Sequence, residues 1–114
     1  MDQSLNYYQS CIKELLSTYE TMRTEHSKVE LIFDDERGHY MAVRIGWFNQ
    51  RYTHFCLVHI EICDGQVIIH CNNTEDLIAT ELSEMGIPKH KIILGFIPPE
   101  IRMLSNNVKD YYTL

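Results

Sequence analysis

The chain contains little proline or glycine and no long apolar run. Three prolines in 114 residues are typical of a folded chain rather than a disordered one, and the five glycines are too few and wrongly placed for a phosphate-binding loop or a dinucleotide fingerprint. No stretch approaches the roughly 18 apolar residues of a membrane-spanning helix, and the segment from Met1 to Ser4 lacks the basic and apolar regions of a secretion signal. We therefore expect a cytoplasmic protein without a membrane anchor.

The cysteines show no spacing typical of a disulfide framework or a zinc ribbon. No Cys-x-x-Cys pair is present among Cys11, Cys56, Cys63 and Cys71. In a reducing compartment such cysteines are mostly small, buried apolar residues. The sequence therefore predicts a domain that folds without disulfides, and we expect no cofactor.

Basic residues are in the minority and do not cluster. The chain has 16 acidic and 10 basic side chains, which gives a formal net charge of −6. A protein of this sign gains no general attraction from a phosphate backbone, so we expect no direct binding of nucleic acid. A helix-turn-helix role for the second predicted helix is excluded because it would turn acidic residues toward phosphates, namely Glu75, Asp76, Glu81 and Glu84.

Apolar residues make up 45% of the chain and charged residues 23%, as in an ordinary folded domain. A chain of this length fits a single domain, residues 1–114, with one core. Apolar residues recur at helical spacing from about Ser4 to Arg23, which predicts an N-terminal amphipathic helix. Three strands are predicted next, because short runs rich in β-branched and aromatic residues alternate with turn residues, at Val29–Asp34, His39–Gly46 and Tyr52–Cys63.

Asp64-Gly65 predicts a two-residue hairpin turn, since both positions tolerate positive φ. That turn fixes a register in which Cys63 faces Gln66 and His59 stands directly opposite His70. His59, Glu61, Ile68 and His70 then share the polar side of the hairpin. Cys56 is expected on the other, apolar side with Val58 and Ile60.

A second helix is expected after Asn73 or Thr74, either of which can cap it, and it ends at Gly86 and Pro88. A fifth strand is predicted at Lys91–Phe96, before Pro98-Pro99. The predicted fold class is α+β: an antiparallel β-meander of about four to five strands, with the N-terminal helix and the second helix packed against the sheet.

The strongest local candidate for a chemical site is the pair His59 and His70, because opposed strand side chains can share a metal ion. Glu61 is the candidate third ligand. The alternative is that these residues simply form the solvated or partner-binding face of a hairpin. Two weaker candidates are the acidic cluster Asp34-Asp35-Glu36, which a turn explains, and Cys56 with His54 or His59 as its base, where we expect a packed thiol.

Aromatic residues gather around the second predicted turn, at Trp47, Phe48, Tyr52 and Phe55. Tryptophan and tyrosine dominate binding hot spots, so these four residues are candidates for a partner interface. They can equally form a hydrophobic cap on the end of the sheet. No catalytic residue is predicted.

Several motifs in fixed order resemble the XisI family, the fdxN element excision controlling factor of cyanobacteria. They extend from about Leu5 to Arg102 and comprise "ELIFDDERGHY", Gly46-Trp47, "HIEICDGQVIIHCNNTED", "LIATELSEMGIPKHKIILGF" and Pro98-Pro99. The chain departs from the family at Ile97, where a histidine is common. It departs again in residues 103–114, which form a divergent C-terminal tail.

The resemblance implies an accessory controlling factor for site-specific DNA excision during heterocyst differentiation, not an enzyme. It implies contacts with an XisH-like protein and an XisF-like recombinase. Two alternatives stay open: an antitoxin-like or immunity-like inhibitor of an XisH-type, nuclease-like partner, and a small metal-dependent enzyme using His59, Glu61 and His70. We also expect a homodimer, formed through a sheet edge or the aromatic residues.

Overall fold

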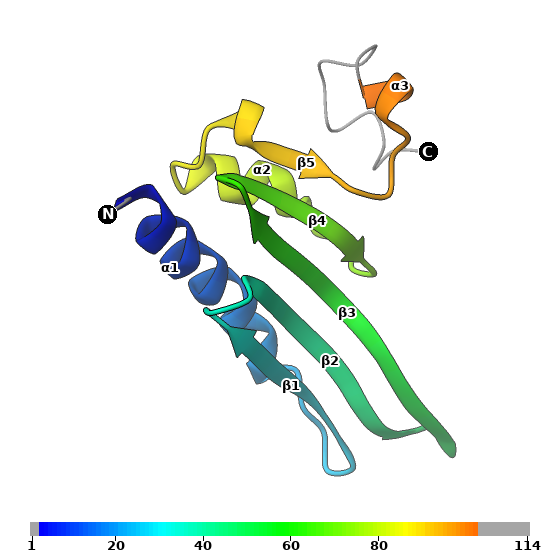
Figure 1. Cartoon of the computed structure of the whole chain (residues 1–114). Helices are drawn as coiled ribbons and strands as arrows, with labels where there is room; N and C mark the ends of the chain where they lie inside the picture. Colours follow the sequence, from blue (N-terminus) through cyan, green and yellow to red (C-terminus); the bar gives the residue numbers. More distant parts are fainter. Residues whose placement is uncertain (1–2, 103–114) are drawn as a thin grey trace.

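A five-stranded mixed sheet with two helices on one face forms the centre of the structure, a computed structural model that describes residues 3–102 (Figure 1). The predicted divergent tail, residues 103–114, lies outside the described residues. The strands follow the order β1-β2-β3-β4-β5 across the sheet. The elements are α1 (Gln3–Ser17), the 3-10 helix η1 (Thr18–Thr21), β1 (Ser27–Asp34), β2 (His39–Phe48), β3 (Arg51–Cys63), β4 (Gln66–Asn72), α2 (Ile78–Glu84), the 3-10 helix η2 (Lys89–Lys91), β5 (Ile92–Leu94) and α3 (Pro99–Arg102).

Helix α1 packs one apolar stripe into the core, as its periodicity predicts, with Ile12 and Leu16 fully buried. The helix is shorter than predicted, and only a 3-10 turn continues it to Thr21. Hydroxyl groups compete for the backbone at this end: Ser17 donates to the Lys13 carbonyl at 2.6 Å and Thr18 to the Leu15 carbonyl at 2.7 Å. None of the described helices is long and apolar enough to cross a membrane.

Strands β1 to β4 form the predicted antiparallel meander. The β3–β4 turn has positive φ at Asp64 and Gly65, as its sequence predicts. The β2–β3 turn is of the same kind, with φ of 51° at Asn49 and 66° at Gln50. Its two-residue length extends β2 and β3 beyond the predicted ends and produces a long hairpin (Figure 1).

Strand β5 differs from the rest of the meander because it pairs parallel with β4, from Val67–Ile92 to Ile69–Leu94. The connection between β4 and β5 contains α2, which returns the chain to the starting end of β4, as a parallel pair requires. β5 is also shorter than predicted, ending at Leu94.

Helix α2 begins at Ile78, several residues after the predicted caps, so the prediction that Asn73 or Thr74 caps it is wrong. Residues 72–76 instead form a turn that is stabilised by side-chain hydrogen bonds. The Asn72 carbonyl oxygen Oδ1 accepts the backbone N–H of Thr74 at 3.0 Å, and Thr74 Oγ1 accepts the N–H of Asp76 at 3.0 Å. Tyr19 donates to Asp76 Oδ2 at 2.6 Å, which ties this turn to η1.

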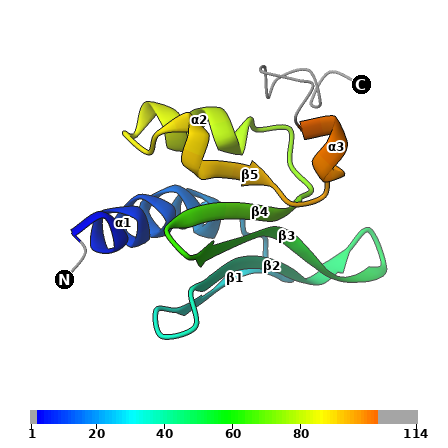
Figure 2. The ribbon, with the colours of Figure 1, turned by 45° about the horizontal axis from the view of Figure 1, so that its top comes forward.

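The two faces of the sheet have different surroundings. The inner face packs against α1 and α2, which lie on the same side (Figure 2), and it contributes buried residues such as Tyr40, Val58, Ile60, Val67 and Ile69. No helix within residues 3–102 packs against the opposite face, which we call the outer face. Alternation along the paired strands assigns to the outer face Lys28, Glu30, Ile32, His39, Met41, Val43, Ile45, Trp47, Tyr52, His54, Cys56, His59, Glu61 and Ile68.

Candidate functional site

The predicted pairing of His59 with His70 is wrong in its register, because a bulge interrupts the β3–β4 ladder. The ladder follows the prediction from Cys63–Gln66 to Ile60–Ile69 and then shifts, so that His59 lies opposite Cys71. The extra residue of the bulge is His70. The two imidazoles nevertheless remain neighbours, with ring centroids 5.1 Å apart.

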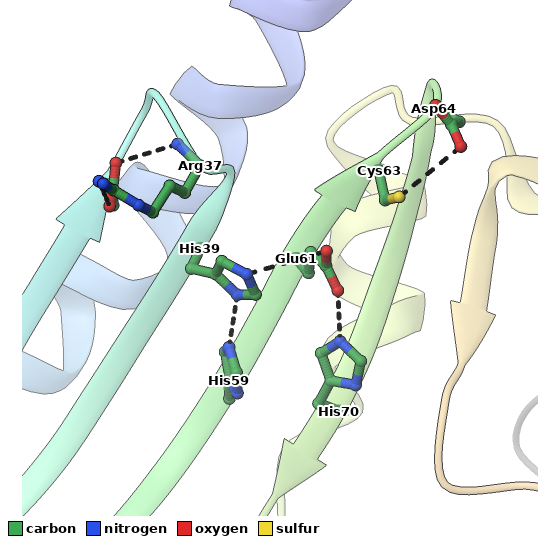
Figure 3. Close-up of polar contacts among 8 residues, drawn as sticks. Arg37, His39, His59, Glu61, Cys63, Asp64 and His70 are labelled. Atoms are coloured by element: carbon green, nitrogen blue, oxygen red, sulfur yellow. Dashed lines mark hydrogen bonds and ion pairs between the residues drawn. The ribbon is translucent and has the colours of Figure 1, made fainter.

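Four side chains form a connected polar network on the outer face, as Figure 3 shows. Nε2 of His70 lies 2.7 Å from Oε1 of Glu61, and Oε2 of the same carboxylate lies 3.8 Å from Nε2 of His39. Nδ1 of His39 lies 3.0 Å from Nε2 of His59. The order along the network is therefore His59, His39, Glu61 and His70, with residues from β2, β3 and β4.

His39 was not among the predicted site residues, although the sequence contained the information needed to find it. His39 opens β2, and the short turn before it places β2 beside β1. Pairing β2 with β3 brings His39 opposite Glu61. Extending the hairpin register by one strand would have added this histidine to the predicted set.

The surroundings of His59 favour its neutral form. Partial burial lowers the pKa of His59, and the neighbouring His70 and His39 lower it further, while Glu61 opposes the shift. Within residues 3–102 no group of three or more His, Cys, Asp or Glu side chains is arranged to hold a metal ion. Instead, His70 hydrogen-bonds to Glu61, and the rings of His59 and His70 are in contact.

Cys56 lies on the outer face opposite Val43, so the prediction that it shares the apolar side with Val58 and Ile60 is wrong. The cause is a second bulge, between the Ala42–Val58 and Val43–Cys56 pairs, which reverses the alternation of β3. Burial and the neighbouring Cys71 raise the pKa of Cys56 to about 12. A thiol in such surroundings is a poor nucleophile.

The acidic cluster has a structural role at the β1–β2 turn. Asp34 accepts the backbone N–H of Arg37 at 3.0 Å and pairs with its guanidinium group. Asp35 accepts a hydrogen bond from Lys13 at 2.7 Å and another from the buried Tyr40 hydroxyl at 2.8 Å. These donors lower the pKa of both carboxyl groups, and the Asp35 contacts fasten α1 to the sheet.

The four aromatic residues predicted as an interface lie near the tip of the β2–β3 hairpin, which extends past the end of β4 (Figure 1). Trp47 and Tyr52 lie opposite each other in an edge-to-face contact, 5.4 Å between ring centroids. Phe48 and Phe55 point to the other side of the hairpin. Each of these four residues is between 38% and 58% exposed.

Small size, a five-stranded sheet with one open face and two helices on the other face define the chain as a small α+β domain (Figure 2). The family model described as XisI protein matches residues 1–108. The chain belongs to the XisI family.

Two solved structures from Anabaena variabilis ATCC 29413 are similar to this chain. A XisI-like protein is 34% identical with a TM-score of 0.83, and the match covers 90% of this chain and 95% of that one. The fdxN element excision controlling factor XisI is 28% identical with a TM-score of 0.72, and the match covers 88% of this chain and 99% of that one. A comparison with curated proteins found no match. The predicted family and fold class are therefore confirmed.

Proposed function

We propose that this protein is a non-catalytic controlling factor for site-specific excision of a DNA element and that it acts through protein contacts. Its similarity to a structure described as an excision controlling factor supports the process. The outer face supports the mode of action, because its apolar residues Ile32 and Trp47 are 49% and 57% exposed. Exposed apolar residues beside a polar network are typical of protein interfaces.

The partners that we propose are an XisH-like protein and an XisF-like recombinase. The net charge of −6 disfavours unaided binding to DNA and favours a partner with a basic surface. The single observation that carries this proposal is the outer face, which no helix of the described chain covers. A partner docked there would contact Met41, His59 and the neighbouring residues of the polar network.

Co-purification with the XisH-like protein at low and high salt tests the proposal. We expect a complex that weakens as salt increases, because opposite charges attract across the interface. Met41→Glu, at the centre of the outer face, should abolish the complex. Met22→Glu is the matched control, since Met22 is 43% exposed and lies outside the sheet, after η1. Absence of any complex, or equal loss with both variants, would contradict the proposal.

The acidic charge also favours a second candidate, an antitoxin-like inhibitor of an XisH-type, nuclease-like partner. This candidate predicts that the purified partner cleaves DNA and that an equimolar amount of this protein stops the cleavage. The controlling-factor proposal instead predicts that excision requires this protein. An excision assay and a DNA cleavage assay with the same two proteins separate the two functions.

A further inference from the structure

Within residues 3–102, no strand pairs with one edge of the segment Arg51–Phe55 of β3. β2 pairs with β3 as far as Phe48–Arg51, at the hairpin turn, whereas β4 pairs with it only from Val58 onward. Asn73 closes the end of the β4 ladder by donating its backbone N–H to the Leu57 carbonyl at 2.8 Å. Arg51–Phe55 therefore has β2 on one side and no strand of the described chain on the other (Figure 1).

The backbone groups on this edge are spaced for pairing with another strand. In a hairpin with a two-residue turn, the residues flanking the turn, here Phe48 and Arg51, form the closing hydrogen-bonded pair. The alternation of an antiparallel ladder then directs the N–H and C=O of Tyr52 and His54 away from β2. Cys56 follows the same alternation, and its carbonyl accepts the Asn73 side-chain amide on that side at 2.9 Å.

We propose that a second copy of this chain pairs with this edge, so that Arg51–Phe55 of the two copies form an antiparallel ladder around a two-fold axis at Thr53. In this register Tyr52 of each copy stands opposite His54 of the other, and the two residues exchange both backbone hydrogen bonds. Both copies use the same surface, as a closed two-fold dimer requires. The inference goes beyond the proposed function and does not depend on it.

The side chains of the segment are complementary to themselves in this register. Tyr52 meets His54, Thr53 meets Thr53, and Arg51 meets Phe55. Aromatic pairs, threonine pairs and a cation against a ring each stabilise a ladder, and no like charges oppose each other. Tyr52 is 58% exposed and Phe55 38% exposed in the single chain, so dimerisation would remove apolar surface from water.

The other long edge of the sheet is less suited to self-pairing. β1 carries the exposed charged residues Lys28 and Glu30, whose side chains lie 3.6 Å apart. Charged side chains on an edge strand discourage pairing with another chain. In the hairpin segment, by contrast, only Arg51 carries a fixed charge. The structure therefore favours β3 over β1 as the dimer edge.

Sedimentation velocity across a wide range of concentration tests this arrangement. We expect the wild type to dimerise and His54→Pro to be monomeric, because proline removes the outward N–H and leaves the hairpin bonds to β2 in place. Near-ultraviolet circular dichroism of Trp47 checks that the hairpin of the variant remains folded. The matched control is Ile32→Lys, at a 49% exposed position on β1, which should dimerise like the wild type.

Cysteine cross-linking supplies a second, independent measurement. Thr53 faces Thr53 at a non-hydrogen-bonded position, where Cα atoms approach to about 4.5 Å, within disulfide range. Thr53→Cys should form a covalent dimer on mild oxidation, whereas Lys28→Cys and the wild type should not.

Three results would overturn the proposal. The first is a wild-type chain that remains monomeric. If His54→Pro then also loses binding of the XisH-like partner, the edge is the binding site of that partner instead. The second is a dimer that Ile32→Lys disrupts and His54→Pro does not. The third is equal cross-linking of Thr53→Cys and Lys28→Cys.

Discussion

Nε2 of His70 lies 2.7 Å from a carboxylate oxygen of Glu61, on a sheet face that no described helix covers. The side chain of His70 is 38% exposed and that of Glu61 23% exposed. Water screens a pair in this position, so its contribution to folding is small. We propose that the pair contributes more to the binding of a partner than to the stability of the sheet.

Glu61→Gln should therefore separate binding from folding. We expect the free energy of unfolding in urea to change by less than about 1 kcal/mol, because ion pairs near the surface contribute little. Binding of the XisH-like partner should weaken by about tenfold, as when a charged group is removed from an interface. Glu30→Gln, an acidic residue of the same face with a longer contact to Lys28, is the control and should bind normally.

The lowered pKa of His59 predicts that stability falls in mild acid. The unfolded chain takes up this proton near the ordinary value of 6.5, whereas the folded chain resists it because of burial and the neighbouring histidines. Stability should thus decline as pH falls below 6.5. Urea unfolding at several pH values should show a shallower decline for His59→Gln than for the wild type. The exposed His26→Gln should follow the wild type, and parallel curves for all three proteins would contradict this account.

Protonation of Asp35 should cause a second loss of folding stability, at lower pH than the protonation of His59. Lys13 and Tyr40 hold the pKa of its carboxyl group below the ordinary 3.8, so its contribution is present above that value and is lost as pH falls through the depressed pKa. Asp35→Asn should be less stable than the wild type at neutral pH, and the difference should disappear in strong acid. Glu36→Gln, in the same turn, is the control. Thermal unfolding monitored by circular dichroism measures the difference.

The cysteines should differ in their rates of alkylation. Cys63 is exposed and should react first with iodoacetamide, even though the adjacent Asp64 raises its pKa. Cys56, with a pKa of about 12, has about one part in ten thousand as thiolate at pH 8 and should react slowly. Peptide mass spectrometry over time measures both rates, and Asp64→Asn should accelerate only Cys63. Rapid modification of Cys56 would revive its interpretation as a nucleophile.

Gly46 should tolerate no side chain. Its φ is +133°, and an added Cβ would lie 2.3 Å from the His26 carbonyl oxygen and 2.5 Å from Ser27 Cα. Gly46→Ala combines backbone strain with a backbone clash, and we expect it to lower the free energy of unfolding by about 2–4 kcal/mol. Gly65→Ala is the matched control. Its φ is +77° with no atom within 4 Å of the new Cβ, so only strain of about 1–2 kcal/mol applies.

Most of the fold was predictable because its signals are local. The Asp64-Gly65 turn fixes the first pairs of the β3–β4 ladder, and the spacing of apolar residues in α1 defines its buried stripe. The parallel orientation of β5 was not predictable in the same way. The orientation depends on where α2 returns the chain. The predicted start of α2 was misplaced, because Asn72 and Thr74 form a side-chain turn before the helix begins.

The candidate site was predicted in part: His39 was missed, and the two errors in side-chain placement come from bulges. Each bulge inserts one residue, which leaves the composition of a strand unchanged but reverses its alternation beyond that point. His59 consequently pairs with Cys71, and Cys56 changes face. Glu61 and His70 lie on their predicted face. Glu61 lies between the hairpin turn and the β3–β4 bulge, and His70 is the bulged residue itself, so neither lies beyond the point where the register shifts.

The parallel attachment of β5 also has a consequence for how the chain assembles during synthesis. Strands β1 to β4 pair with their sequence neighbours across short turns, so their contacts close small loops and can form as soon as each hairpin leaves the ribosome. β5 must wait for α2 to complete its crossover, and its only described partner strand is β4. Until β5 pairs, β4 is an unpaired edge strand of the nascent sheet. We therefore expect ribosome-bound chains that end before Ile92 to be the species most prone to aggregate.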